Sequence, residues 1–574
     1  MAKINPLELE KIFQQRPFQT RNADEYDLEN ILDLFVDPTS GLIGPFEFTN
    51  AIIKGKMGSG KTMYLRANYA YHLYTLVPCL NEGSQIILPV YIKLSDFQNL
   101  RKPEAIYEEI LKKLIKEIVG VINHLQSAEE LSRLHTGAMT LNESWSRNED
   151  LNDLVEDLKR LNADSYAQSV KSSLDEGGTV ANNFLNLYKK YGKEVTTQIQ
   201  KNTKPTFEMV TDACEKLLSP FNGKLLILFD EIGSTCKSFF RGTEDADSYF
   251  VTLMNQLRTL SNVRTKLAVY PNSEADILRE TRYGDVVSLE CDIINHPEQL
   301  ESYTLIIISL IERYINRVSQ RSIHVEAVFE ATNTDQKIIE HLVNASSGNM
   351  RRLVHILDLA MNEAYIRGRG YVRVSVEDVI NALNRQGSEM INLYQPDEID
   401  FIKTIAKLCK SRSTYRFSYP NKTSTITKYT NRSEEYNIIN ILQNGSGRKK
   451  TTYYFDYAFC VYQDLPTHYI KSTERIDKSR SRITGEPILR IAQLSDELII
   501  QSSLPVKIDG EIKYLGQMNE SGIILGADGK EYFFSISNII NVDKKKKIYI
   551  GKKVRFMPSP LAGGNYMATE IEVL

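Results

Sequence analysis

The sequence of 574 residues predicts an α/β protein, in which a parallel sheet is covered by helices and smaller modules follow. Three observations predict this class. Apolar strands alternate with helical segments in the first half of the chain, as in parallel sheets with helices on both faces. A glycine-rich loop separates the first strand from its helix. From about Leu504 to Leu574, short strands alternate with Gly and Asp turns, which is typical of an all-β module.

The elements follow one another in a readable order. Residues 22–37 read as an acidic helical lead-in, which Pro38 ends. A polar helical insertion is expected at about 123–203, and it contains the single tryptophan, Trp145. The segment from His296 to Gly387 is helical throughout. The expected strands are "NAII" at 50–53, "ILPVYIKLSDF" from 87, "KLLILFDEIG" from 224, "KLAVYPN" from 266 and "DVVSLEC" from 285, and an amphipathic helix is expected from 103 onward.

Composition excludes several classes of protein. Hydrophobic residues make up 42% and charged residues 25%, as in soluble globular proteins. The N-terminus lacks the apolar core of a signal peptide, and the apolar run from Thr304 meets a charge at Glu312, too early for a membrane span. The six cysteines are scattered without a CxxC pair, so neither a disulfide framework nor a zinc site is indicated. We therefore expect a cytoplasmic protein that does not engage a membrane.

Charge is distributed unevenly along the chain. The net charge is −3, but from residue 401 onward 27 Lys and Arg face 17 Asp and Glu, a net of +10. The preceding residues therefore carry −13. A basic end on an acidic body favours a polyanionic partner such as DNA, while a solvated basic surface is the plainer alternative.

The stretch "GKMGSGKT" carries the clearest chemistry in the sequence. It satisfies the pattern G-x-x-x-x-G-K-[ST], in which glycines let successive backbone N–H groups point at a phosphate. Lys61 would bridge phosphate oxygens, Thr62 would hold Mg²⁺, and the positive end of the following helix completes the anion site. The alternative is a glycine-rich turn with an incidental lysine. The predicted nucleotide-binding residues are Gly55, Lys56, Met57, Gly58, Ser59, Gly60, Lys61 and Thr62.

An acidic pair at the end of a buried strand supplies the second half of the predicted site. Five apolar residues precede Asp230 and Glu231 in "LLILFDE". Asp230 would accept Mg²⁺-bound water and contribute to the metal site with Thr62, while Glu231 would act as general base on the attacking water. An adjacent Asp-Glu pair indicates hydrolysis of ATP to ADP and phosphate rather than binding alone.

Two further roles in the site have two candidate residues each. Asn272 or Ser273, at the end of "TKLAVYPNS", would orient the attacking water, although turns favour such residues without any function. Arg279 or Arg282 would serve as a finger to the γ-phosphate of a neighbouring subunit, and a solvated helix end is the alternative.

Arg351 is the last candidate site residue. It follows the capping residues 346–349 in "SSGNMRRLVHILDLA", so it lies in the first turn of a helix, where a positive charge opposes the helix dipole. Such a cation favours an anionic partner, with ATP the obvious one. An ion pair with a local carboxylate is the alternative reading. We expect Leu353, Ile356, Leu357 and Ala360 to form the buried face of this helix.

The order of the phosphate loop, "LLILFDE", "LAVYPN" and "GNMRRL" resembles AAA+ ATPases, particularly the origin-recognition and initiator clade. The resemblance covers roughly residues 30–390. It implies a P-loop NTPase core of αβα type with five strands, a helical lid, and ATP bound between them. It also implies that Lys61, Thr62, Asp230, Glu231, Asn272 and Arg351 take the family's roles. The long insertion before the acidic strand departs from the typical initiator.

The basic end of the chain reads as two modules. The helix in "PDEIDFIKTIAKLCK" lies where initiator-type ATPases carry a winged helix, and "SEEYNIINILQNGSGRKKTTYYF" offers a helix, a basic loop (Arg448, Lys449 and Lys450) and a strand as a wing. Such a wing could contact either phosphates or protein, and the sequence leaves both alternatives open. The last segment resembles a cold-shock domain, a five-stranded OB-type barrel. Of the aromatic residues that stack on bases in cold-shock domains, this sequence keeps Tyr514 and Phe533. Ser521 and Ile523 stand where cold-shock domains have aromatic residues, so DNA and protein both stay possible partners.

The expected domains are a nucleotide-binding core at 1–295, a helical lid at 296–390, a winged-helix-like domain at 396–500 and a small β-barrel at 504–574. Our leading hypothesis is an ATP-hydrolysing assembly switch or loader that forms a homo-oligomer and acts on or with DNA. The alternative is a sensor or signalling ATPase, for example in bacterial antiphage defence, that recognises a protein trigger and recruits a protein effector.

Overall fold

The structure is a computed structural model, and it confirms the predicted α/β class. The described residues are 4–38, 44–82, 85, 87–111, 113–114, 207, 211, 223–241, 248–271, 283–291, 293–294, 296–330, 337–411, 414–419, 426, 429–430, 435–446, 450–465, 491–494, 507–516, 521–539, 548–560 and 566–574. The predicted insertion at 123–203, Trp145, Asn272, Ser273, Arg279, Arg282, Arg448 and Lys449 lie outside these residues.

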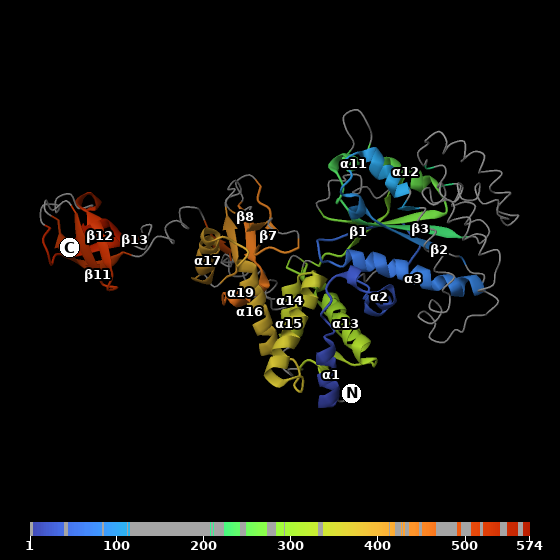
Figure 1. Cartoon of the computed structure of the whole chain (residues 1–574), viewed down its shortest axis with the longest axis horizontal. Helices are drawn as coiled ribbons and strands as arrows, with labels where there is room; N and C mark the ends of the chain where they lie inside the picture. The colour runs from blue at the N-terminus through green and yellow to red at the C-terminus, as the bar shows by residue number, and fades with distance from the viewer. Residues whose placement is uncertain are drawn as a thin grey trace, which may run out of the picture.

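A five-stranded parallel sheet forms the core (Figure 1). Its strands run in the order β2-β3-β4-β1-β5, so β4 lies between the strand before the phosphate loop and the strand that ends in Asp230 and Glu231. The expectation of five strands is confirmed. The strands are β1 (Ala51–Lys54), β2 (Ile87–Lys93), β3 (Lys224–Ile232), β4 (Val263–Val269) and β5 (Asp285–Ser288).

Alternate residues of the strands feed two hydrophobic clusters, one on each face of the sheet. In β3, Leu225 and Ile227 belong to one cluster, while Leu226 and Leu228 belong to the other. Because both faces of β3 are buried, this strand reads as a continuous apolar run rather than as an alternating pattern. The helices of this part are α1 (Pro6–Gln15), α2 (Leu28–Leu34), α3 (Lys61–Glu82), α11 (Lys237–Arg241) and α12 (Tyr249–Thr259).

The second of these clusters continues from the sheet into four helices that we call the lid. Buried residues of the lid, such as Ile311, Leu342 and Leu357, share this cluster with Ala51 and Ile53 of β1. One hydrophobic core therefore joins the lid to the sheet at the phosphate loop. The lid helices are α13 (Leu300–Ser319), α14 (Lys337–Ser346), α15 (Met350–Gly368) and α16 (Val376–Ile391).

A mixed module follows the lid, and we call residues 396–494 the C-terminal sheet segment. Its four-stranded sheet has the order β7-β8-β6-β9. Residues 439–443 form a strand that pairs antiparallel with the strand at 451–455, so the prediction of a helix in "SEEYNIINILQ" is wrong. The elements are α17 (Pro396–Ser411), β6 (Arg416–Tyr419), β7 (Ile439–Gln443), β8 (Thr451–Phe455), α19 (Tyr457–Tyr462) and β9 (Ile491–Gln493).

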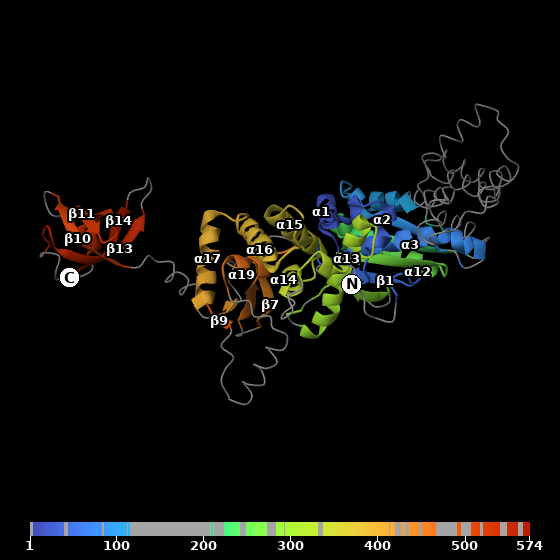
Figure 2. The ribbon, with the colours of Figure 1, turned by 90° about the horizontal axis from the view of Figure 1, so that it is seen from below.

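The end of the chain is a closed five-stranded barrel in the order β10-β11-β12-β14-β13, which stands apart from the rest of the described chain in Figure 2. Tyr514, Ile523, Phe533 and Met567 are neighbours across four strands on its outer side. Tyr514 and Phe533 are 54% and 50% exposed, so this row is open. The strands are β10 (Ile508–Leu515), β11 (Ser521–Gly526), β12 (Glu531–Ser535), β13 (Lys553–Pro560) and β14 (Tyr566–Val573).

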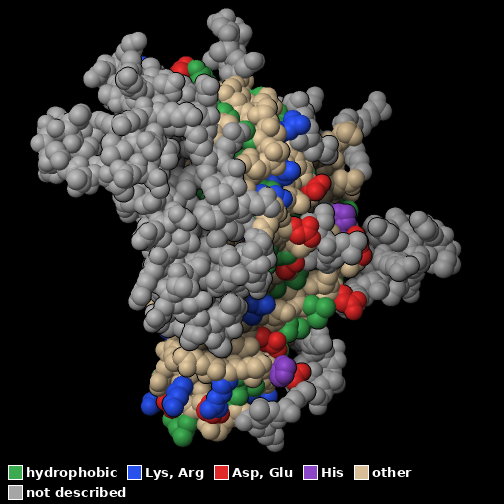
Figure 3. Space-filling model, turned by 90° about the vertical axis from the view of Figure 1, so that its right-hand side faces the viewer, with side chains coloured by type: hydrophobic (Ala, Val, Ile, Leu, Met, Phe, Trp, Pro, Cys, Tyr) green, Lys and Arg blue, Asp and Glu red, His purple; other side chains and the backbone are tan. Residues whose placement is uncertain are grey.

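The surface of the core carries charges of both signs. Figure 3 shows acidic and basic side chains intermixed over the described part of one face. None of the helices in the described part of the chain combines the length and apolar character needed to cross a bilayer.

Candidate functional site

The phosphate loop runs from the end of β1 to the first residue of α3. Its backbone takes the left-handed conformation at Gly58 and Gly60, with φ of 80° and 97°. A Cβ at Gly60 would meet nothing within 4 Å, whereas a Cβ at Gly58 would lie 2.3 Å from the amide oxygen of Asn349 in the lid. Gly60 is therefore needed for its conformation alone, and Gly58 also for the close approach of the lid.

Lys61 lies buried inside this loop. Its ammonium group donates hydrogen bonds to the carbonyl oxygens of Gly55 and Lys56 at 2.7 and 2.8 Å, and it sits 4.1 Å from the ring centroid of Tyr270. Burial lowers the pKa of Lys61 to about 8, although Asp230 and Glu290 act against this shift. An anion placed in the loop would supply the negative charge that this buried cation lacks.

Asp230 is a buried carboxylate next to the first turn of α3. It is 1% exposed, and its Oδ2 accepts a hydrogen bond from the Tyr91 hydroxyl at 2.5 Å. Burial raises its pKa, while the hydrogen bonds from Tyr91, from Thr62 and from the backbone of Glu231 lower it. Thr62 and Asp230 therefore lie next to each other. Tyr91 was not predicted, and its only signal is that it lies on the strand next to Asp230.

Glu231 follows Asp230 with a strained backbone. Its φ is 54°, which is uncommon outside glycine and recurs at functional sites. The pairing of β3 with β4 is irregular between Phe229 and Ile232, so Glu231 lies outside the regular ladder of the two strands. Lys93 at the end of β2 lies 3.4 Å from the Glu231 carboxylate and 2.8 Å from Asp24, and it therefore restrains the predicted base.

The first turn of α15 brings the lid onto the phosphate loop. Asn349 caps this helix with its side chain, and the backbone N–H groups of Met350 and Arg351 both donate to the carbonyl oxygen of Gly58, at 2.9 and 3.2 Å. Arg351 is in the first turn as predicted, and its positive charge is close enough to Lys61 to act on it. Its guanidinium lies 3.7 Å from the carboxylate of Glu435, which comes from the C-terminal sheet segment. The carboxylate partner exists, but it comes from a distant part of the chain.

The predicted buried face of α15 is confirmed. Leu353, Ile356, Leu357 and Ala360 are all buried in the cluster that joins the lid to the sheet. Arg351 and the phosphate loop are therefore held together by one packed core rather than by the polar contacts alone.

The strand predicted to orient water has the predicted place in the sheet. β4 lies between β1 and β3, and Tyr270 at its end contacts Lys61. Asn272 and Ser273, the residues predicted to act there, and the finger candidates Arg279 and Arg282 lie outside the described residues.

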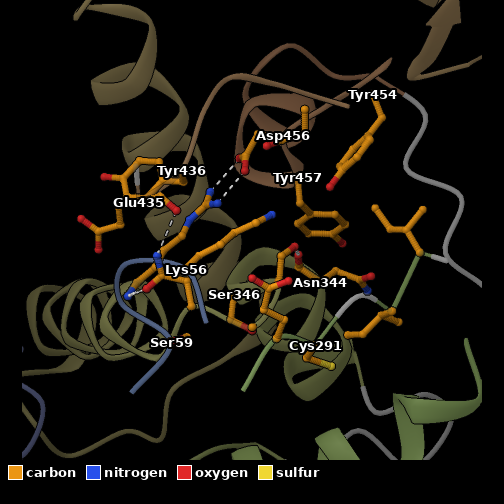
Figure 4. A pocket seen from close by; sticks show the side chains of 18 of the residues that line it. Lys56, Ser59, Cys291, Asn344, Ser346, Glu435, Tyr436, Tyr454, Asp456 and Tyr457 are labelled. Carbon is orange, nitrogen blue, oxygen red and sulfur yellow. Dashed lines mark hydrogen bonds and ion pairs between the residues drawn. The ribbon is translucent and has the colours of Figure 1, made fainter. Parts of the chain in front are cut away.

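A cavity of about 150 Å³ opens beside the phosphate loop, where the loop, the lid and the C-terminal sheet segment meet (Figure 4). Figure 4 shows Lys56 and Ser59 from the loop, Asn344 and Ser346 from the lid, and Tyr436 from the C-terminal sheet segment around it. Within the described residues, the Ser59 hydroxyl and one oxygen of Glu290, which also line this cavity, are buried without a hydrogen-bond partner.

A buried ion pair, which the sequence did not reveal, fixes the C-terminal sheet segment to the lid. Arg352 donates to both carboxylate oxygens of Asp456 at 2.5 and 2.6 Å, and the two side chains are 2% and 5% exposed. The guanidinium also lies 4.8 Å from the ring centroid of Tyr436. Asp456 accepts N–H bonds from Ala458 and Phe459 as the N-cap of α19. The only sequence signal is a capping Asp before a short helix.

Comparisons with known proteins agree with the site. A family model described as ORC-CDC6-like matches residues 16–236, which include the phosphate loop, Asp230 and Glu231. Among solved structures the chain is similar to the ORC2 protein of Aeropyrum pernix, in a structure of ADPNP-ADP complexes, with 14% identity over 68% of this chain and 78% of that chain. The TM-score of this alignment is 0.30. No curated protein matches the chain. Residues 16–236 are therefore similar to an ORC-CDC6-like domain.

Proposed function

We propose that this protein binds and hydrolyses ATP and works as a nucleotide-dependent assembly switch or loader on or with DNA. One observation carries the proposal. Lys61, Asp230 and Glu231 lie at the carboxyl edge of one parallel sheet, and the lid presents Arg351 to the same loop. Catalysis of phosphoryl transfer depends chiefly on such positioning and charge, so this arrangement suits the reaction.

Each residue has a definite part in the proposed reaction. Lys61 neutralises phosphate oxygens within the loop, and Arg351 binds the γ-phosphate from the lid side. Glu231 polarises the attacking water, for which it must be ionised and free of Lys93. The lid excludes other water from the loop.

Mg²⁺ fits the donor set at the loop. Among the described side chains no cluster of three or more His, Cys, Asp or Glu is arranged to hold a metal ion. Mg²⁺ does not need one, because it is commonly held by one or two protein oxygens together with waters and substrate phosphates. The Thr62 hydroxyl and the Asp230 carboxylate are the two groups that would hold Mg²⁺. The ion would neutralise charge that develops on the phosphates.

The switch is proposed to depend on the lid. ATP bound between the core and the lid would hold them in one arrangement, and hydrolysis would release it. In the ATP-bound arrangement, subunits would associate across the nucleotide, with Arg282 or Arg279 as the residue donated by the neighbour. ATP-dependent homo-oligomers are the result expected from this arrangement.

The barrel provides the support for a nucleic-acid partner. Tyr514, Ile523 and Phe533 form an open row on its outer side, and exposed aromatic rings of this kind stack on bases. The chain from residue 401 onward carries a net charge of +10, which favours contact with phosphates.

The first experiment measures size and ATP hydrolysis with and without DNA. The proposal predicts that ATP raises the molecular mass, and that Lys61→Ala abolishes both nucleotide binding and the mass change. Unchanged ATP hydrolysis in both the Lys61→Ala and Glu231→Gln variants would contradict the proposed function.

The second experiment replaces Tyr514 and Phe533 by alanine in the full chain. Stacking on an aromatic ring contributes about 1–3 kcal/mol per base, so we expect at least about a tenfold loss of affinity for single-stranded DNA. The exposed Tyr549, replaced alone, is the matched control, because it lies on the barrel outside this row. An intact ATPase without salt-dependent DNA binding would favour the sensor function, with a protein trigger and effector, over the DNA function.

A further inference from the structure

The first turn of α15 contacts the phosphate loop and the C-terminal sheet segment at the same time. The side-chain amide of Asn349 donates to the carbonyl oxygen of Met57 and to that of Glu435, both at 3.4 Å. The next two N–H groups of this turn bind Gly58. A single helical turn therefore connects the phosphate loop to the C-terminal sheet segment.

Two neighbouring arginines of this turn meet two neighbouring residues of the C-terminal sheet segment. Arg352 lies against Tyr436 and is locked to Asp456, while Arg351 is paired with Glu435. The two contacts differ in strength. The Arg352 pair is buried and bidentate, whereas the side chains of Arg351 and Glu435 are 37% and 21% exposed and 3.7 Å apart. The buried pair fixes the segment in place, and the open pair can exchange its partner.

We infer that Glu435 sets how strongly the site distinguishes ATP from ADP, by competing with the γ-phosphate for the guanidinium of Arg351. This inference rests on the proposed function. ADP lacks the γ-phosphate, so with ADP bound Arg351 keeps its pair with Glu435. With ATP bound, the guanidinium turns to the γ-phosphate and the Glu435 carboxylate is released to solvent.

Thermodynamic linkage gives this exchange a second consequence. If Glu435 weakens the binding of ATP by some factor, ATP must weaken the contact of Glu435 with the lid by the same factor. The nucleotide state is thereby reported to the C-terminal sheet segment, and a partner that pulls Glu435 away from Arg351 strengthens ATP binding. A half-exposed ion pair of this length supports an effect of about two- to fivefold.

The test compares the affinities for MgATP and MgADP in the full chain. All proteins carry Glu231→Gln, so that ATP survives the measurement. We expect Glu435→Gln to raise the ratio of ATP affinity to ADP affinity about two- to fivefold, with ADP affinity unchanged. The matched control is Glu389→Gln, which removes a carboxylate from the exposed pair with Arg385 on α16 and leaves the ratio unchanged. In an Arg351→Ala background, Glu435→Gln is expected to have no effect.

The outcomes separate this inference from the proposed function. If Lys61→Ala abolishes binding but Glu435→Gln leaves the ratio unchanged or lowers it, the inference is overturned and the proposed function stands. An equal change in the Arg351→Ala background also overturns it, because the effect then does not pass through Arg351. If the chain binds neither nucleotide, or Lys61→Ala binds both normally, the proposed function and the inference fall together.

Discussion

Replacing Arg352 by methionine removes one half of the buried ion pair between the lid and the C-terminal sheet segment. The two N–O contacts to Asp456 are 2.5 and 2.6 Å long, and neither side chain is more than 5% exposed. Methionine fills a similar volume without a charge. The substitution therefore leaves the Asp456 carboxylate buried without its cation.

The magnitude follows from what each partner has left. Removing one partner of a buried pair costs about 3–5 kcal/mol. After Arg352→Met, Asp456 still accepts N–H bonds from Ala458 and Phe459, so we expect the lower end, about 3 kcal/mol. Asp456→Ala also removes the cap of α19, which adds about 1 kcal/mol to the larger cost of an unpaired guanidinium. Asp456→Ala is thus the more damaging of the two.

Native-state hydrogen exchange at the amides of α19 and α16 measures this effect, because unfolding of a chain with several modules is not two-state. The predicted result is a loss of about 3 kcal/mol in the opening free energy of α19 for Arg352→Met. Arg385→Met, on the exposed pair with Glu389, is the control and should change it by no more than about 0.5 kcal/mol. A loss below about 1 kcal/mol for Arg352→Met, or an Asp456→Ala variant that is no worse, would refute the reasoning.

Three further predictions concern the nucleotide core. Burial lowers the pKa of Lys266 to about 7 from an ordinary value of 10.5, so the unfolded chain binds more protons between these values and the free energy of unfolding rises with pH, by up to about 1.4 kcal/mol per unit. Native-state hydrogen exchange at the amides of β4 should show this rise in opening free energy between pH 7 and pH 9 in the unaltered chain but not in Lys266→Met. The same rise in both proteins would contradict the burial of a charge. Lys93→Met removes the ion pair with the Glu231 carboxylate and should raise ATP turnover by up to about fivefold, because this pair is only partly buried. Slower turnover would show instead that Lys93 assists the reaction. Gly58→Ala places a Cβ against the side chain of Asn349 at a positive φ, so nucleotide affinity should fall at least about tenfold in equilibrium binding, with unchanged affinity as the contrary result.

Local patterns predicted the core of the fold and the centre of the candidate site. The glycines and Lys61 of the phosphate loop, and an apolar strand that ends in Asp230 and Glu231, carry their geometry in the order of neighbouring residues. Buried parallel strands such as β3 are likewise continuous apolar runs, so they could be placed from sequence. The chemical roles of these residues remain predictions.

The contacts made across distant parts of the chain could not be predicted. Arg352 and Asp456 are 104 positions apart, and no periodicity connects them. Glu435 stands in a segment that reads as a helix because "YNIINIL" is a short apolar run, and such runs do not distinguish a helix from a strand. Residues 439–443 form the strand β7 rather than a helix because they pair with β8. Tertiary packing, rather than local propensity, therefore placed a carboxylate beside Arg351.

The central claim is that Glu231 activates water against ATP held by Lys61 in this site. A single-turnover measurement of radiolabelled ATP, with bound and cleaved nucleotide quantified separately, tests it most directly. We predict that Glu231→Gln binds ATP as tightly as the unaltered chain but cleaves it at least about a hundredfold more slowly, as expected for loss of a general base. Cleavage at the unaltered rate in Glu231→Gln with normal ATP binding would contradict the account.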